Sequence, residues 1–438
     1  MALAPPTATA PDPNERPPEF SRAYTRYALG LLLLVYVVNF LDRQVVAILL
    51  QAIKEDLQLS DTQLGAFSGI AFALLYSTLG IPIAQWADRG VRRSIISLAM
   101  LTWSGMTALQ GLATGFWTLV AARVGVGVGE AGCSPPAHSI IADLFAPTRR
   151  ATALSIYALG IPIGGAIGLA GGGWLRETFD WRIALMIVGV PGIVLAVLVR
   201  LTLREPTRGY WEGGRTEAAP PPPLAEVARV LRMRRSFVHM ALAGALHAFY
   251  GYGAAAFNPA FLERVHELGA LEIGLWLGVI AATAGAAGTF LGGWLTDRLS
   301  TRDARWYAWL PAWGTIAGVP LVCLFYLWQD GREALALAAL PALVGGLYLG
   351  PTFAMTQALV PPRMRAQAAA ILLLVMNLIG LGLGPQFVGM LSDWLAPSTG
   401  VESIRWALLW TIVVGALWSA VHYFRAARTL TEDLRAAG

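Results

Sequence analysis

The sequence predicts an all-α membrane protein with twelve transmembrane helices in two pseudo-symmetric six-helix bundles. Of the 438 residues, 56% are hydrophobic and only 13% are charged, whereas about a quarter of a soluble domain is charged. Apolar runs of about 20 residues, the length that crosses about 30 Å of hydrocarbon as a helix, recur along the chain with short polar breaks. One longer break in the middle divides the runs into two sets of six.

The two sets of runs define the predicted organisation of the chain. The N-terminal bundle is expected at 27–203 and the C-terminal bundle at 236–425, joined by a linker at 204–235 that is rich in Gly and Pro and ends in a basic stretch. Residues 1–26 and 426–438 are predicted tails. The twelve spans are expected at 27–50, 63–86, 94–113, 117–143, 151–174, 183–203, 236–262, 272–296, 306–328, 334–359, 366–391 and 404–425.

The basic residues are distributed unevenly between the two sides of these bundles. With both termini on one side, 24 of the 32 Arg and Lys residues lie on that side, six lie in the opposite loops and two lie inside helices. Because cytoplasmic loops carry an excess of Lys and Arg, we expect a multi-pass protein with both termini in the cytoplasm. The short loops and the use of 31 Arg against a single Lys favour a bacterial inner membrane. The net charge of +5 is spread over short loops and does not indicate nucleic-acid binding.

Two stretches at matching places in the two halves repeat one motif. The stretch 84–93 reads AQWADRGVRR after the second run, and 293–302 reads GWLTDRLSTR after the eighth. A small residue lets helices approach closely, an aspartate can face the positive end of a neighbouring helix, and arginines hold the aqueous side. We interpret both copies as a cytoplasmic gate motif made of Asp88, Arg89, Arg92, Arg93, Asp297, Arg298 and Arg302.

This repeat, the six-plus-six arrangement and the linker resemble the Major Facilitator Superfamily over almost the whole chain. The stretch 123–129, RVGVGVG, resembles the superfamily's helix 4 motif, and 160–168, GIPIGGAIG, resembles its helix 5 motif, although Ala84 and Ile161 stand where glycine is usual. The resemblance implies a secondary transporter that works by alternating access, usually as a monomer. Packing or hinge roles are expected for Pro162, Gly164, Gly165, Gly168, Gly384 and Pro385, because small residues allow tight helix crossing and proline allows bending.

Four ionisable residues lie inside predicted helices of the N-terminal half: Asp42, Arg43, Arg123 and Glu130. A charge at a helix centre costs about 2.5–3.5 kcal/mol on insertion scales, so such residues are functional candidates. Arg123 and Asp42 are predicted at matched depth and are expected to pair, which leaves Glu130 as a deeper carboxylate. Arg43 lies about 100° from Asp42 around the helix, so it is expected to be structural or gate-forming.

These four residues predict proton coupling. We expect Asp42 and Glu130 to bind and release a driving proton, because rocking between two open states changes both the hydration and the neighbouring charge of a buried carboxyl group. Arg123 is expected to exchange partners and to meet an anionic substrate group, and Arg43 is the second candidate residue for this substrate and ion-pair switch. A static set of buried ion pairs that only specifies helix packing is the alternative.

The stretch 39–44, NFLDRQ, together with 123–132, RVGVGVGEAG, resembles the bacterial members of the spinster family. The resemblance implies export or efflux of sphingolipid and lysophospholipid species, so the partners expected are an amphipathic lipid-like substrate, protons and the bilayer. It carries the family's acidic residue and arginine of helix 1 to Asp42 and Arg43, and its arginine and glutamate of helix 4 to Arg123 and Glu130. No cofactor and no metal is expected.

The C-terminal half contributes no confidently intramembrane charge, only polar and aromatic candidates. A cavity that is charged on one wall and apolar on the other suits an amphipath. His247 is expected to be a neutral, satisfied histidine more than a proton carrier. Fewer than half of the candidate lining residues are expected to be contacts: His247, Tyr250, Asn258, Tyr348, Thr352, Met355, Gln357, Met376 and Asn377.

Other functions remain open at this point. The acidic residues also fit a proton-coupled multidrug or organic-cation efflux antiporter, and the arginines fit an organic-anion carrier. A remote alternative is a membrane-embedded acyltransferase-type enzyme, because His138 and Asp143 have the spacing of a base and its orienting acid. That six-residue pattern is short, and no phosphate-binding glycine loop or metal-ligand cluster accompanies it.

Overall fold

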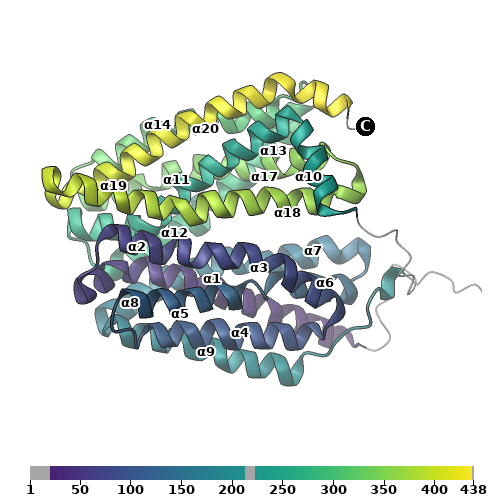
Figure 1. The fold of residues 1–438 in the computed structure, drawn as a ribbon, viewed down its shortest axis with the longest axis horizontal. Helices are drawn as coiled ribbons and strands as arrows, with labels where there is room; N and C mark the ends of the chain where they lie inside the picture. The colour runs from purple at the N-terminus through teal and green to yellow at the C-terminus, as the bar shows by residue number, and fades with distance from the viewer. Residues whose placement is uncertain (1–19, 213–221, 437–438) are drawn as a thin grey trace, which may run out of the picture.

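The computed structural model describes residues 20–212 and 222–436, which form two helical halves stacked on each other (Figure 1). The predicted N-terminal tail up to residue 19, the end of the C-terminal tail, and part of the linker with Gly213 and Gly214 lie outside the described residues. Within the described ranges the chain forms helices and short turns, and no strand. The sequence prediction of an all-α fold of two bundles is confirmed.

The N-terminal half places its six spans close to the expected positions. Three of the spans are interrupted, at Gly69, at 131–133 and at Leu159. The helices are α1 (Arg22–Leu57), α2 (Asp61–Ser68), α3 (Ile70–Arg89), α4 (Arg92–Gln110), α5 (Phe116–Glu130), α6 (Ser134–Leu144), α7 (Pro147–Ala158), α8 (Gly160–Thr178) and α9 (Trp181–Thr202), followed by η1 (Tyr210–Glu212).

The C-terminal half follows the same plan with more local distortion. Its elements are α10 (Leu224–Met233), α11 (Arg235–His266), α12 (Ala270–Ile280), η2 (Ala281–Gly285), α13 (Ala286–Ser300), α14 (Trp306–Leu327), α15 (Gly331–Leu337), α16 (Ala339–Gly345), η3 (Gly346–Tyr348), α17 (Leu349–Ala358), η4 (Pro362–Met364), α18 (Arg365–Met376), η5 (Asn377–Leu383), α19 (Gly384–Thr399), η6 (Gly400–Glu402) and α20 (Ser403–Arg435). Both η2 and η5 are π-helical, a distortion that is frequent at functional sites.

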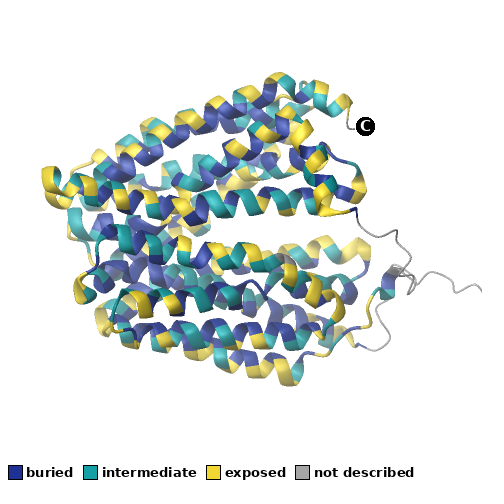
Figure 2. Ribbon diagram, viewed as in Figure 1, coloured by how far each residue is buried: buried dark blue, intermediate teal, exposed yellow. Residues whose placement is uncertain are grey.

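The outward faces of the helices suit contact with lipid. Large apolar side chains such as Trp117, Phe290 and Leu201 are exposed there, and exposed positions alternate with buried ones along the outer helices (Figure 2). Eight helical stretches of the described chain are long and apolar enough to cross a membrane on their own, and the last, Pro362–Arg435, contains two predicted spans. The spans of α4, α5–α6 and α11 are not among the eight, since they are broken or carry buried polar residues.

Glycines bring α8 against α1 in the N-terminal half. A Cβ atom at Gly168 would lie 2.7 Å from the carbonyl oxygen of Leu41, and Gly164 meets the Val37 carbonyl in the same way. Gly165 has only Gln44 near it. Pro162 is the third residue of α8, where a helix needs no backbone N–H donor. In the other half Gly384 packs against the Phe249 carbonyl, and the Pro385 carbonyl contacts Gly65.

The two halves meet along α8 with α12, α2 with α19, and α3 with η5. We call the end where α9 leaves for the linker the linker end, and the end where α1 turns into α2 the far end. At the far end the Asp61 carboxylate binds Arg264 of the other half at 2.7 and 2.8 Å, and it also binds Lys54 and Ser392. Between described residues, all hydrogen bonds and ion pairs that join the halves lie at this end.

A second carboxylate completes this far-end latch. Asp393 accepts the backbone N–H groups of Asp61 and Thr62 at 3.0 and 2.8 Å, which are free donors at the start of α2. The α2 N-terminus is therefore capped by a residue from the opposite half. The latch holds the far end closed, and among the described residues no hydrogen bond or ion pair joins the halves at the linker end.

We expect Arg264→Gln to shift the two halves toward a state that is open at the far end. The substitution leaves the nearly buried Asp61 without its main partner, which costs about 3–5 kcal/mol in the closed state. Spin labels at Thr114 and Ser398 on the two halves should show a longer distance population by double electron–electron resonance. Arg332→Gln is the control, because its pair with Glu272 lies within one half, and an unchanged Arg264→Gln distribution would show that the latch does not set the conformation.

Candidate functional site

The central ionic contact joins α1 to the end of α5. Arg43 Nε donates to Glu130 Oε2 at 2.5 Å, with the Arg43 side chain 15% exposed and the Glu130 side chain fully buried. A buried pair of opposite charges is tolerated in a low-dielectric interior only when its geometry is good. The pair therefore links α1 to the end of α5 through their side chains.

The expected pairing of Asp42 with Arg123 is wrong. Asp42 instead accepts a hydrogen bond from Thr107 of α4 at 3.2 Å, and the Nε and Nη1 atoms of Arg123 have no hydrogen-bond partner. The reason lies in the helix itself: successive residues point about 100° apart, so Asp42 faces α4 while Arg43 faces α5. Glu130 was expected to have no direct partner, and Arg43 was expected to be structural or gate-forming. Instead, Arg43 forms the direct ion pair with Glu130.

Aromatic rings surround both arginines. The Arg43 guanidinium lies 4.5 Å from the ring centre of Tyr76 and 4.9 Å from that of Phe72, and Arg123 lies 4.8 Å from the same Phe72 ring. Cations are attracted to aromatic faces, most strongly where water is excluded. Phe72 thus lies between two arginines. Sequence reasoning missed Phe72 and Tyr76, although their spacing of four places them on one face of α3.

The fourth predicted span breaks immediately after Glu130, between α5 and α6. Helix α5 ends at Glu130 and α6 begins at Ser134, followed by Pro135 and Pro136. Proline has no backbone N–H, so the carbonyl groups four residues earlier lose their helical partners. The carboxylate therefore sits at the C-terminus of one helical segment, beside a natural flexing point.

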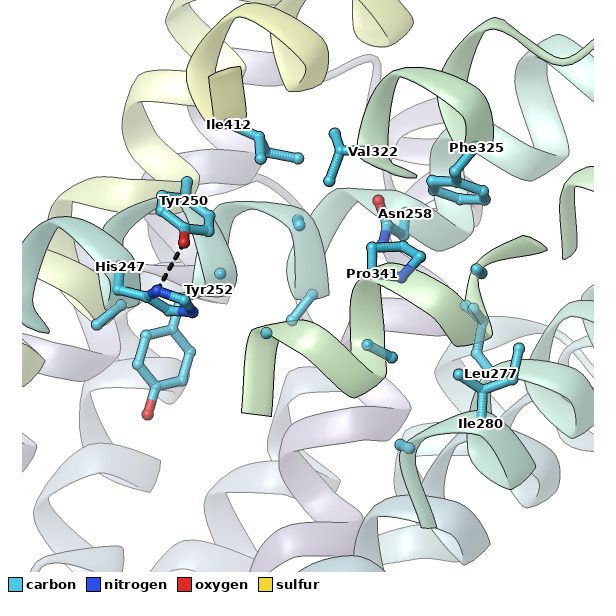
Figure 3. A pocket seen from close by; sticks show the side chains of 18 of the residues that line it. His247, Tyr250, Tyr252, Asn258, Leu277, Ile280, Val322, Phe325, Pro341 and Ile412 are labelled. Carbon is cyan, nitrogen blue, oxygen red and sulfur yellow. Dashed lines mark hydrogen bonds between the residues drawn. The ribbon is translucent and has the colours of Figure 1, made fainter. Parts of the chain in front are cut away.

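A cavity of about 460 Å³ lies mainly in the C-terminal half (Figure 3). It is bounded by α11, α12, α14, α16 and α20, and Gln44 and Leu169 extend its wall to the other half. In Figure 3 the polar residues His247, Tyr250 and Tyr252 lie at one end and Phe325, Leu277 and Ile280 at the other. The cavity is therefore polar at one end and apolar along most of its length. Gln44, which directly follows Arg43 in the chain, lines this cavity, and Tyr252 at the polar end lies within reach of the Arg43 charge.

Four of the nine predicted lining residues reach this cavity: His247, Tyr250, Asn258 and Tyr348. The other five do not line it. Thr352, Met355 and Met376 are buried in packing between helices, Gln357 is exposed, and Asn377 lies in the π-helical η5. Helical phase explains the misses, because residues on the far side of α17 and α18 share the span but not the face.

His247 is held by aromatic neighbours on both sides. Its Nδ1 is 2.6 Å from the Tyr250 hydroxyl, drawn as the dashed line in Figure 3, and its ring stacks on Tyr348 at 3.7 Å between centres. Asn258 accepts from the Tyr326 hydroxyl at 2.6 Å. His247, Tyr250 and Tyr348 therefore form a preorganised polar end, whereas Asn258 lies toward the other end of the cavity, near Phe325 in Figure 3.

The family model for the Major Facilitator Superfamily matches residues 32–385. The chain belongs to this superfamily. It is 34% identical over 413 residues to an MFS-type efflux pump of Mycolicibacterium smegmatis, covering 93% of this chain and 94% of the pump. It is 29% identical to human protein spinster homolog 1, over 90% of this chain and 80% of that protein. A sphingosine-1-phosphate transporter of Xenopus tropicalis is 26% identical over 87% of this chain and 76% of that protein.

Solved structures agree with this membership. A bacterial homologue of the human lysosomal transporter spinster, in an inward-facing and occupied conformation, matches with a TM-score of 0.84 and 35% identity over 94% of this chain and 99% of that chain. A nucleoside transporter shares the fold alone, with a TM-score of 0.72 and 12% identity over 92% and 99% of the two chains. The spinster-type assignment is confirmed, and this protein is a transporter and not an enzyme.

The first copy of the repeated motif forms a buried lock within the N-terminal half of this transporter. Arg92 is fully buried and binds Glu205 at 2.6 Å, Ser139 at 2.7 Å and the carboxylate of Asp143. The Arg93 backbone N–H binds the same Glu205 at 3.1 Å. Asp143 thus forms an ion pair with Arg92, while the ring of His138 packs against Tyr157. His138 and Asp143 therefore do not form the acid–base pair that their spacing would allow.

The other motif residues are less constrained. Asp88 and Arg89 are exposed at the end of α3, and Arg302 is exposed after α13. In the second copy Asp297 accepts from the Tyr307 hydroxyl at 3.5 Å, and Arg298 lies over the Trp294 ring. The two copies therefore match in sequence but not in contacts, and their gate role stays a prediction.

We expect Arg43→Gln and Glu130→Gln to be coupled in stability. Each single change leaves a buried group unpaired and should cost about 3–5 kcal/mol, whereas the double variant should lose clearly less than the sum. Thermal unfolding in detergent measures the cycle. The control is the exposed Arg182–Asp56 pair, 2.8 Å apart, which should show about 0–1 kcal/mol of coupling. If the stability losses of Arg43→Gln and Glu130→Gln simply add, the Arg43–Glu130 pair is not a stabilising contact.

Proposed function

We propose that this transporter moves an amphipathic, lipid-like substrate, a lysolipid or sphingolipid, by proton-coupled alternating access. One observation carries the proposal: a charged, arginine-containing wall in one half stands beside a largely apolar cavity in the other. Such an arrangement offers different surroundings to the two ends of one molecule. The name of the Xenopus relative, a sphingosine-1-phosphate transporter, is consistent with this class of substrate.

The cavity is proposed to take the hydrocarbon tail. Its deeper wall consists of apolar side chains, among them Leu277, Ile280, Val322 and Phe325. Each buried CH₂ group contributes about 0.8 kcal/mol. A tail therefore gains affinity with length until the cavity is full.

The headgroup is proposed to lie toward Arg43. An anionic head would compete with Glu130 for the guanidinium, because both are oxygen acceptors for the same donors. Arg123, whose Nε and Nη1 have no partner, supplies a second positive charge nearby. A protonated Glu130 would release Arg43 to the head, so proton binding and headgroup binding support each other.

The direction of access is proposed from the far-end latch. The latch closes the far end, so the substrate enters and leaves this conformation from the linker end. The excess of arginines on the linker side favours a cytoplasmic linker, in a bacterial inner membrane. The inward-facing state of the matched spinster homologue supports the same orientation.

A second candidate is efflux of organic cations. The Mycolicibacterium relative is named an efflux pump, and the buried carboxylates of Asp42 and Glu130 would attract a cation. The two functions differ in which probe responds to the pH gradient. A cationic dye transported in preference to a lysolipid would favour drug efflux.

In proteoliposomes with an imposed pH gradient, we expect Glu130→Gln and Asp42→Asn each to lower gradient-driven transport of a fluorescent lysolipid by more than about tenfold. An amide of the same shape cannot take up the proton, while exchange of the probe at equal pH should persist. The exposed Glu55→Gln serves as control. Full gradient-driven transport in both variants would contradict proton coupling at these residues.

The cavity predicts a preference for tail length. We expect affinity to rise about fourfold per CH₂ in a series of lysolipids until the cavity is filled. Ala342→Leu, which adds volume to the lining, should shift the preferred tail to shorter chains. Tryptophan fluorescence quenching measures binding, with the exposed Ala358→Leu on α17 as control. A preference unchanged by Ala342→Leu would place the tail elsewhere.

A further inference from the structure

A polar stripe runs along one buried face of α4. Trp103, Thr107 and Gln110 are spaced by four and three residues, which places them on one side of the helix. Their exposed fractions are 0%, 1% and 0%. Thr107 donates to Asp42 of α1 at 3.2 Å, so the stripe faces the buried carboxylate.

Several polar atoms along this stripe have no protein partner. They are both amide atoms of Gln110, Asp42 Oδ1, and Nε and Nη1 of Arg123, whereas the side chain of Trp103 lies within hydrogen-bonding reach of the Asp42 carboxyl group. A buried polar group left unsatisfied is strongly disfavoured, and in folded proteins such groups are usually satisfied by ordered water. A concentration of them within three neighbouring helices, α1, α4 and α5, points to one shared hydration site.

The stripe has an outer and an inner end. Gln110 is the last residue of α4, and the exposed residues Leu112 and Thr114 follow directly. At the mouth Arg182 donates to the carbonyl of Ala113 and pairs with the exposed Asp56. On the linker side of Thr107, Trp103 packs closely against α5, because a Cβ atom at Gly129 would lie 2.8 Å from the Cβ of Trp103.

We propose that this stripe holds a short file of water molecules that carries protons between the far surface and Asp42, separately from the substrate cavity. The inference deepens the proposed function and rests on its proton coupling. A proton passes from bulk water at the far side through hydrogen-bonded water to Asp42 Oδ1, converting the carboxylate to a carboxylic acid. No other bond is made or broken.

The placement lets Asp42 exchange protons while the halves stay latched. Asp42 faces α4 and not the cavity, whereas Glu130 is engaged by Arg43. The charges that act on Asp42 are those of Glu130 and Arg123, both on α5, with Arg43 adjacent in the chain. Trp103 ends the water file on the side of the linker end. The file therefore opens only to the far surface, and protons do not leak through it across the membrane.

The inference is tested by removing the polar groups of the stripe without touching the cavity. Thr107→Val and Gln110→Leu should each reduce gradient-driven transport of a fluorescent lysolipid in proteoliposomes by about tenfold, because each interrupts the file. Exchange of the same probe at equal pH should stay within about twofold of the unsubstituted protein, since binding and rocking need no proton through this route. Thr102→Val, on the exposed face of α4, is the matched control and should leave both rates unchanged.

Two outcomes would overturn the proposal. Unreduced gradient-driven transport in the Thr107→Val/Gln110→Leu double variant would show that protons take another route. An equal loss of driven transport and exchange would show that the stripe serves packing alone. If the pH gradient does not change transport by the unsubstituted protein, the proposed proton coupling is wrong as well. If the gradient drives the unsubstituted protein but the variants behave like it, only the water file is wrong.

Discussion

The Arg43–Glu130 contact is the constraint on which the rest of the site depends. Two charges in a membrane interior are stable only while they face each other or another polar group. The contact ties α1 to α5, orients Arg43 beneath Phe72 and Tyr76, and leaves Asp42 to face α4. Any process that separates the pair must supply a new partner for each charge, and in the proposed function these partners are a proton for Glu130 and an anionic headgroup for Arg43.

The charged residues and the cavity-lining residues are distributed unevenly between the two halves, although both halves share one helical arrangement. The N-terminal half holds all four intramembrane charges and the buried Arg92 lock, and the C-terminal half holds most of the cavity wall. The π-helical segments η2 and η5 both belong to the C-terminal half. Charge needs rigid, satisfied geometry, whereas an apolar tail needs only volume and shape. The asymmetry therefore suits the two ends of the amphipathic substrate that we propose.

The fold could be predicted from the sequence because hydrophobic length and the central break report directly on membrane spans. The charged candidates could be found for the same reason, since Asp42 and Glu130 stand out in apolar runs. Their pairing could not be predicted, because it depends on a rotation of about 100° between neighbouring residues and on the depth of two separate helices. The latch of Asp61 with Arg264 was missed because its residues are about 200 positions apart and each looks like an ordinary loop charge.

The break after Glu130 links the pair to the linker end. Helix α6, beyond the break, carries Ser139 and Asp143, which hold Arg92 at the start of α4. Because Pro135 and Pro136 interrupt the hydrogen bonds between α5 and α6, the two segments are not one rigid rod. Movement at Glu130 can then be taken up at 131–133 while the Arg92 lock keeps α4, α6 and Glu205 together. The N-terminal half can therefore exchange the partner of its central arginine without dismantling its linker end.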